Sequence, residues 1–303
     1  MKKRILGAIG VAALAAGIAH AEILEITGEF AAPNREASLL RSISIDRIDG
    51  QDGAALERAI EQGLSSTHFD LMGGRTGRSN AEGSLSGGVT TGVDERPFKK
   101  NEKRCLEKDS ANQNKCVREG YVELRCRRRT ISVKADLRLV RNRDGRIVYS
   151  ASKPFTQDTS WCEGQSAPGP VEEVIADAVR SLGYSVRNDI APTISTYSIR
   201  VRESDKGMSK EQSKRFKELV KLTKRDVRGA CAGWAALGNE LPHHPSLAFD
   251  LGLCAEQAGD YARALQYYHA ASRAGASEGR EGADRAVRLI AGKEDAAIRA
   301  RRR

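Results

Sequence analysis

The chain has 303 residues, which is enough for one large hydrophobic core or two smaller ones, and we expect two domains. Its 50 Lys and Arg outnumber its 40 Asp and Glu, giving a formal charge of +10. Beyond residue 21 no stretch is long and apolar enough for a helical membrane span, so none is expected in the mature chain.

The first 21 residues have the order of a secretory signal. Met1 to Arg4 are basic, residues 5–18 are apolar, and Ala19-His20-Ala21 fits a cleavage site. We expect cleavage after Ala21 and a periplasmic or secreted protein; an uncleaved anchor is the alternative. No cysteine follows the cleavage site, so no lipid anchor is expected there.

Removing the signal lowers the formal charge to +7, and the last five residues, Arg299 to Arg303, include four arginines. In an exported protein this basic balance suits anionic lipid or polysaccharide, and nucleic acid is not an expected partner. A solvated basic surface and tail is the alternative interpretation.

Strand and helix patterns alternate in the first half of the mature chain. Residues 39–45 and 69–72 have strand character, and residues 54–64 place Leu56, Ile60 and Leu64 on one helical stripe. A glycine-bearing strand at 81–89 leads to a charged loop at 94–114. Residues 121–140 alternate for much of their length and predict a strand that turns back at Gly145.

A helix is predicted from Pro170 to Leu182, ending at Gly183 or continuing through it, and then a closing strand over 193–201. The polar run 204–209 has the composition of a linker. From residue 210 onward the strand pattern is absent. The expected fold class is therefore α+β, with a mixed α/β domain at 22–203, a helical domain at 210–292 and a basic tail at 293–303.

The six cysteines predict three disulfides, because an even number in an oxidising compartment favours pairing over metal binding. If Asn142 pairs with Arg146 across the turn, paired residue numbers sum to 288, which places Cys126 opposite Cys162. Opposite strand positions are close enough for a disulfide. Cys105 and Cys116 then bracket the polar loop and pair with each other. No metal site or cofactor is expected.

Residues 245–278 carry a pattern of small and aromatic residues that lets two antiparallel helices approach closely. Its members are Leu251, Gly252, Ala255, Tyr261, Ala264, Tyr268 and Ala271. This segment resembles a tetratricopeptide repeat, although Ala248 and Ala276 replace the usual tryptophan and proline. In that register Cys231 and Cys254 lie on facing helices, so we expect them to pair; two free buried thiols are the alternative.

The order of elements over residues 38–202 is similar to a periplasmic α/β domain. That domain is shared by curli-secretion lipoproteins of the CsgG type, penicillin-binding-protein activators of the LpoB type and the TolB amino-terminal domain. The resemblance is carried by 43–45, 56–64, 82–87, 137–148 and 190–192. It implies this fold and a cell-envelope setting. The absent lipidated cysteine and the cysteine-bearing insertion at 94–121 depart from the pattern.

The leading functional hypothesis is a non-catalytic periplasmic adaptor that holds envelope proteins through its repeat-like helices. Trp234, Tyr261, Tyr267 and Tyr268 are aromatic candidates for packing or contact, with Trp234 and Tyr267 the candidates for partner contact. A module for anionic lipid or polysaccharide, using 125–129 and 299–303, is the alternative. No acid, base or nucleophile constellation supports a hydrolase, so no catalytic residue is expected. A helical domain that only stabilises the first domain is a further alternative.

Overall fold

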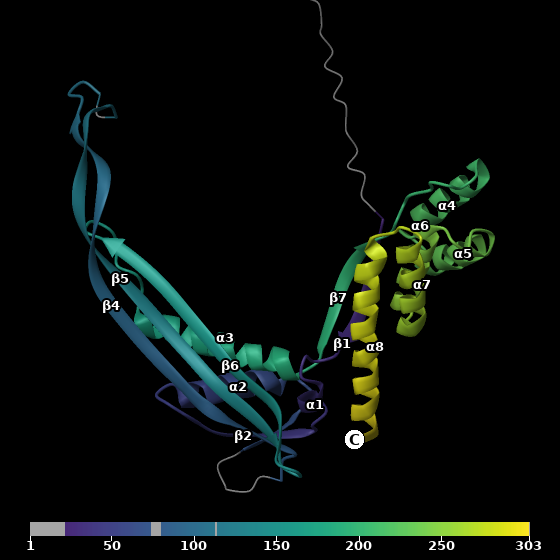
Figure 1. Ribbon diagram of the computed structural model, residues 1–303, viewed down its shortest axis with the longest axis horizontal. Coiled ribbons are helices and arrows are strands. Elements are labelled where there is room, and N and C mark those ends of the chain that lie inside the picture. The colour runs from purple at the N-terminus through teal and green to yellow at the C-terminus, as the bar shows by residue number, and fades with distance from the viewer. Residues whose placement is uncertain (1–21, 74–79, 113, 303) are drawn as a thin grey trace, which may run out of the picture. The chain divides into compact units, whose positions relative to one another are not determined.

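The computed structural model describes residues 22–73, 80–112 and 114–302, and it is α+β as expected (Figure 1). The chain divides into two units. The sheet unit contains Glu29–Ser195 and the residues from Arg288 onward; the helical unit contains Thr196–Val287 and the segment that ends at Gly28. The signal at 1–21 lies outside the described residues. Linker residues 204–209, expected between domains, belong to the helical unit.

The sheet unit is built on five strands in the order β3-β2-β4-β5-β6. They are β2 (Ser42–Asp49), β3 (Asp70–Gly73), β4 (Gly83–Lys108), β5 (Cys116–Arg141) and β6 (Arg146–Cys162). Strand β2 runs parallel to β3 and β4, whereas β4, β5 and β6 form an antiparallel meander. The short helix α1 (Arg35–Ser38) precedes β2.

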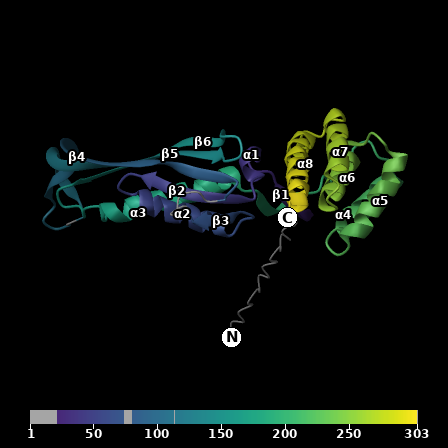
Figure 2. The same ribbon diagram turned by 90° about the horizontal axis from the view of Figure 1, so that it is seen from below.

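Two helices cover one face of this sheet, α2 (Gly53–Ser65) and α3 (Val171–Ile190), as Figure 2 shows. Leu56 and Ile60 of α2 and Val186 of α3 are completely buried against the apolar face of the strands. Helix α3 continues through Gly183 because the two helices touch there. A β-carbon at this position would lie 2.7 Å from the Ala59 backbone.

The helical unit contains α4 (Lys210–Leu222), α5 (Val227–Glu240), α6 (Pro245–Gln257), α7 (Tyr261–Arg273) and the start of α8 (Glu278–Arg302). Side-chain caps fix the starts of α4 to α7: Ser209 forms a capping box with Gln212, and the Asp226, His244 and Asp260 side chains accept from backbone N–H groups. Strands β1 (Ile23–Phe30) and β7 (Thr193–Arg200) pair with each other. The sequence interpretation missed β1, although Leu24 and Ile26 alternate with polar residues.

The predicted turn at Gly145 is one residue out of register. Arg141, and not Asn142, pairs with Arg146, so the local sum of paired numbers is 287. A bulge between Leu139 and Val140 then restores the sum of 288 along the rest of β5 and β6. Cys126 therefore does lie opposite Cys162, and the bulge is the reason.

Candidate functional site

Strands β4 and β5 extend beyond all their neighbours in the sheet (Figure 1). Pairing of β2 with β4 stops at Gly88, and β6 ends at Cys162, opposite Cys126. Past that point residues 99–108 of β4 and 116–125 of β5 pair only with each other, and we call the segment 99–125 the hairpin arm. The charged loop predicted at 94–114 is therefore wrong, because most of this segment is β4.

The sequence predicted a loop here because hydrophobic alternation is absent from this segment. An isolated ribbon has no core to face, so its residues can be polar on both sides. Cross-strand ion pairs take the place of apolar contacts: Lys99 lies 2.8 Å from Glu123, and Lys103 pairs with Glu119. Exposed pairs of this kind contribute less than about 1 kcal/mol each, and a lone hairpin is marginal in water. The arm therefore needs covalent restraint.

Disulfides restrain the arm at both ends. Cys126–Cys162 joins β5 to β6 where the arm begins, and Cys105–Cys116 joins β4 to β5 near the turn. With Cys231–Cys254 in the helical unit, these are the three pairs that the sequence predicted, and they use all six cysteines.

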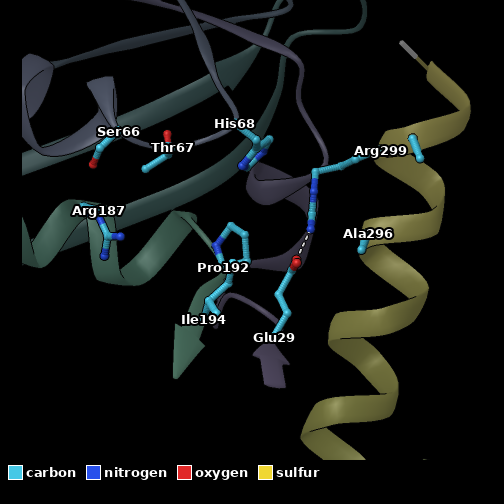
Figure 3. Close-up of a pocket in the computed structure, with 10 residues that line it drawn as sticks. Glu29, Ser66, Thr67, His68, Arg187, Pro192, Ile194, Ala296 and Arg299 are labelled. Carbon is cyan, nitrogen blue, oxygen red and sulfur yellow. Dashed lines mark hydrogen bonds and ion pairs between the residues drawn. The ribbon is translucent and has the colours of Figure 1, made fainter. Parts of the chain in front are cut away.

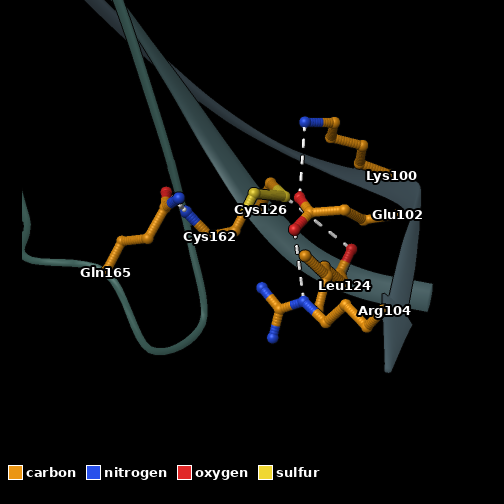
Figure 4. The surroundings of a disulfide bond; sticks show 7 residues. All are labelled: Lys100, Glu102, Arg104, Leu124, Cys126, Cys162 and Gln165. Carbon is orange, nitrogen blue, oxygen red and sulfur yellow. Dashed lines mark hydrogen bonds and ion pairs between the residues drawn. A yellow bond between two sulfur atoms is a disulfide. The ribbon is translucent and has the colours of Figure 1, made fainter. Parts of the chain in front are cut away.

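A small apolar cluster surrounds the disulfide at the base of the arm. Its members are Phe98, Val122, Leu124, Cys126 and Cys162. Figure 4 shows Glu102 beside this disulfide, bonded to Lys100 and Arg104, while Gln165 accepts a hydrogen bond from the Cys162 backbone N–H at 2.9 Å. Hydrogen bonding by Arg104 lowers the pKa of the Glu102 carboxyl. The base of the arm is thus held by packing and by charge.

Near the far end of the arm, apolar side chains face solvent. The Tyr121 side chain is 76% exposed, Val117 is 60% exposed and Leu106 is 47% exposed. Leu106 lies across Gly120, where a β-carbon would come within 2.5 Å of its Cδ1 atom. Sequence reasoning did not select these three residues, because their exposure follows from the missing third strand. An exposed tyrosine on a restrained element is a suitable protein contact.

The basic stretch at 125–129 lies where the arm begins and is partly occupied within the chain. The Glu95 carboxylate accepts hydrogen bonds from Arg127 and Arg129, and these bonds lower the pKa of Glu95. Arg129 also stacks over Trp161 at 5.2 Å and donates to the Gly169 carbonyl. This guanidinium therefore fixes the base of the arm and is poorly available to an external anion.

In the helical unit, the residues of the repeat-like pattern lie at helix contacts. Gly252, Ala255, Ala264, Tyr268 and Ala271 are buried, and Leu251 and Tyr261 are half-buried. A β-carbon at Gly252 would lie 2.6 Å from the Tyr268 ring, so glycine permits the close approach of α6 and α7. This is the packing predicted from the residues; membership of the tetratricopeptide family stays a prediction.

The two aromatic contact candidates have different surroundings. Trp234 is completely buried in the helical core, so its selection as a partner-contact residue is wrong. Its apolar surface is buried where α5 packs into the helical core. Tyr267 is half-buried, with Arg263 over its ring at 5.8 Å. It stays a candidate without a test.

The β1–β7 ribbon covers one face of α6, the helix expected to help bind partners. The Asp250 carboxylate accepts from the Arg202 backbone N–H at 2.8 Å, and Gln257 donates to the Glu25 carbonyl. Tyr197 of β7 donates to Glu256 at 2.5 Å. With Leu24 and Ile26 also in this core, that face of α6 is occupied by the protein's own strands.

A buried ionic network joins α6, α7 and α8. The Glu256 carboxylate receives Arg285 Nε at 2.6 Å and hydrogen bonds from the Tyr197 and Tyr268 hydroxyls. Burial and the adjacent Glu256 raise the pKa of both tyrosines, and Glu256 raises the pKa of Arg285 against the effect of its desolvation. Both phenols therefore stay protonated and the guanidinium stays charged, which suits a structural contact and not proton transfer.

The C-terminal residues are helical, not a free basic tail. Helix α8 continues to Arg302, and its last turns belong to the sheet unit. The completely buried Asp295 carboxylate pairs with Arg35 at 2.6 Å, and Arg302 donates to the Leu39 carbonyl. Arg299 pairs with Glu29 (Figure 3) and is only 11% exposed. The arginines expected to meet an anionic surface are thus partly bound within the protein.

Beside Arg299 the sheet unit has an open cavity of about 380 Å³ (Figure 3). Its polar lining includes Ser66, Thr67, Arg187 and the Glu29–Arg299 pair, and Pro192 and Ile194 contribute apolar surface. The Thr67 hydroxyl donates to the Leu64 carbonyl, and Arg299 is held by Glu29. The buried Nη1 atom of Arg299 has no hydrogen-bond partner among the described residues, and Arg187 donates to the Asn188 side chain at 3.4 Å.

Two kinds of feature are absent from the residues that the structure describes. No cluster of three or more His, Cys, Asp or Glu side chains able to hold a metal ion occurs among them. Within the same ranges, no helix is long and apolar enough to cross a membrane.

Comparison with known proteins gives only distant likenesses. No family model matches the chain, and no curated protein matches it. The PelC dodecamer from Paraburkholderia phytofirmans matches 56% of this chain and 98% of its own, with 18% identity and a TM-score of 0.30. A putative lipoprotein from Caulobacter crescentus CB15 matches 52% and 89%, with 18% identity and a TM-score of 0.24.

A minor lipoprotein from Acinetobacter baumannii matches 50% of this chain and 91% of its own, with 13% identity and a TM-score of 0.24. Scores this low do not transfer a function or a site. The function of this chain therefore has to be inferred from its own residues.

Proposed function

We propose that the protein is an exported, non-catalytic adaptor of the bacterial cell envelope, and that the hairpin arm is its contact element for a protein partner. The observation that carries this proposal is the arm itself. Its paired strands contribute only Val122 and Leu124 to an apolar cluster, yet two disulfides restrain them. A restrained ribbon that ends in exposed Tyr121, Val117 and Leu106 loses little conformational entropy on binding.

Export is supported by the signal-like first 21 residues and by the use of every cysteine in a disulfide. A periplasmic location follows as part of the proposal. The helical unit, with its tetratricopeptide-like packing, serves in this proposal to hold the β1–β7 ribbon. Partner contact is placed on the arm because one face of α6 is already covered.

Contact with an anionic lipid or polysaccharide is the second candidate. The arm carries eight Lys and Arg against five Asp and Glu, which gives it a net positive charge. Binding that depends on this charge weakens steeply as salt rises, whereas binding through Tyr121 and Val117 does not. The salt dependence of binding therefore distinguishes the two candidate functions.

The test is site-specific photo-crosslinking of the full mature chain in envelope extracts. One probe replaces Tyr121 on the arm, and a matched control probe replaces Tyr184 on α3, which is 56% exposed. A third probe replaces the exposed Arg228 of α5. We expect one discrete protein adduct from position 121 that persists at high salt and is lost when Val117→Asp is added.

The outcomes are exclusive. Adducts only from position 228 would transfer the contact to the helical unit and overturn the proposal. Loss of all arm-dependent binding in moderate salt, with retention on vesicles containing anionic lipid or on an acidic polysaccharide, would favour the second candidate.

A further inference from the structure

The three disulfides lie in very different surroundings. Cys126 and Cys162 are only 3% and 8% exposed and are packed in the apolar cluster at the base of the arm. Cys231 and Cys254 are half-buried against the helical core. Cys105 is exposed on a ribbon with no third strand. Because exchange requires that a thiolate reach a sulfur atom, the bond between Cys105 and Cys116 is the most accessible of the three.

Basic side chains surround this bond. Lys108 is the direct cross-strand partner of Cys116, and Lys115 precedes Cys116 in the chain. Lys103, Arg104 and Arg118 also lie within two residues of one or the other cysteine, but they pair with Glu119, Glu102 and Glu107, respectively, so Lys108 and Lys115 supply the charge that matters here. Positive charge stabilises a thiolate and attracts an anionic attacking thiol, so it favours cleavage at this bond.

The backbone around the bond is also irregular. Pairing of β4 with β5 is continuous up to Cys105 opposite Glu119, and it then shifts register twice before Cys116. Between the Cys105–Glu119 pair and the turn, the two strands therefore have fewer regular ladder bonds to keep them together. The disulfide joins two cysteines that are 11 residues apart in the sequence, and it holds the end of the arm in its observed form.

We propose that Cys105–Cys116 is a thiol-exchange site that sets the conformation of the end of the arm. An external thiolate, from a small dithiol or a partner protein, attacks Cys105 Sγ. The Cys105–Cys116 bond breaks, a mixed disulfide forms, and the Cys116 sulfur leaves as a thiolate. A second thiol of the reductant then displaces Cys105. The protein gains two electrons and two protons as two thiols, and the reductant becomes a disulfide.

The functional consequence rests on the proposed role of the arm as contact element. Opening the bond releases Leu106 and Val117 from their fixed positions, whereas Tyr121 lies in the regularly paired part of the ribbon. Oxidation would therefore favour partner contact through all three residues, and reduction would weaken it. The base of the arm would be unaffected, since Cys126–Cys162 is enclosed.

The experiment uses the full mature chain under native conditions, without a partner. The protein is equilibrated with increasing dithiothreitol, the free thiols are alkylated, and the modified cysteines are identified by mass spectrometry. We expect Cys105 and Cys116 to be alkylated first, with the other four protected until denaturant is added. Modification of Cys126 or Cys231 at the same reductant concentration, or no selective modification, would overturn the proposal.

The role of charge is tested by the rate of exchange with dithiothreitol. In the Lys108→Glu/Lys115→Glu variant we expect exchange to slow by about two- to fivefold, because the leaving thiolate loses its neighbouring cations. Lys221→Glu, at an exposed position of α4, is the matched control and should exchange at the wild-type rate. Equal rates in all three proteins would refute the role of the lysines. Since no partner is present, failure here is distinguishable from failure of the crosslinking test.

Discussion

Replacing Gly252 by alanine tests whether close packing of α6 against α7 holds the helical unit together. In an unhindered helix this change stabilises the fold by about 1 kcal/mol, because alanine is the better helix former. Here the new β-carbon would lie 2.6 Å from Cε1 and 2.7 Å from Cδ1 of Tyr268. Both distances are much shorter than an ordinary van der Waals contact.

The Tyr268 ring has little freedom to move away. Its hydroxyl bonds to Glu256, which also binds Arg285 at 2.6 Å, and its ring packs 5.7 Å from Phe249. Overpacking of a rigid core costs about 1–3 kcal/mol. The expected outcome for Gly252→Ala is therefore a net loss of up to about 2 kcal/mol in the free energy of unfolding, opposite in sign to the intrinsic helix preference.

Urea unfolding followed by Trp234 fluorescence measures this loss. The chain has two tryptophans, so the measurement is made in a Trp161→Phe background, which leaves Trp234 in the helical core as the reporter. Gly238→Ala in α5 is the control. Its β-carbon would meet only the flexible end of Leu251, at 3.3 Å, so it should be neutral or stabilising. A Gly252→Ala protein more stable than wild type would refute the packing argument.

Two further predictions concern buried carboxylates. Burial raises the pKa of Asp250 well above its usual value, so the folded state keeps a proton that the unfolded chain loses above about pH 4. The free energy of unfolding of the wild type should therefore fall as pH rises. In urea titrations between pH 5 and pH 8, the stability of Asp250→Asn relative to wild type should increase with pH. A difference between the two proteins that does not change with pH would contradict this. Asp295→Ala should destabilise the sheet unit by about 2 kcal/mol, because Arg35 loses a partner that is fully buried while Arg35 itself is half-exposed. The control Glu294→Ala, whose contact with Arg35 is exposed, should change the urea midpoint little, and equal losses for the two variants would show that burial of Asp295 is unimportant.

Much of the fold could be predicted from local pattern. The stripe of Leu56, Ile60 and Leu64 predicted α2, and the alternation along 131–139 predicted which face of β5 is buried. Such patterns are readable because an element with one buried face repeats its apolar residues with its own period. The Cys126–Cys162 pair followed from strand register, although the turn was misplaced by one residue and a bulge compensated.

The candidate site was largely hidden from this reasoning. A ribbon that packs against no core needs no regular alternation of apolar residues, so the arm resembled a loop in composition. For the same reason Tyr121 was not selected as a contact residue. Trp234 illustrates the opposite error. An aromatic residue has the same identity whether it faces a partner or a core, and only the packing of α5 shows that it is buried.

By itself the sequence determined the alternation of elements, the export signal pattern and the three cysteine pairs, because these depend on residues near one another or on strand register. Only the tertiary structure showed which residues the C-terminal arginines contact and that the arm extends beyond the rest of the sheet. Arg299 meets Glu29 across 270 residues of chain, and Asp295 meets Arg35 across 260. The arm becomes exposed only because β2 and β6 stop short of it. Contacts between distant segments, and the lengths of neighbouring strands, leave no local signal in the amino-acid order.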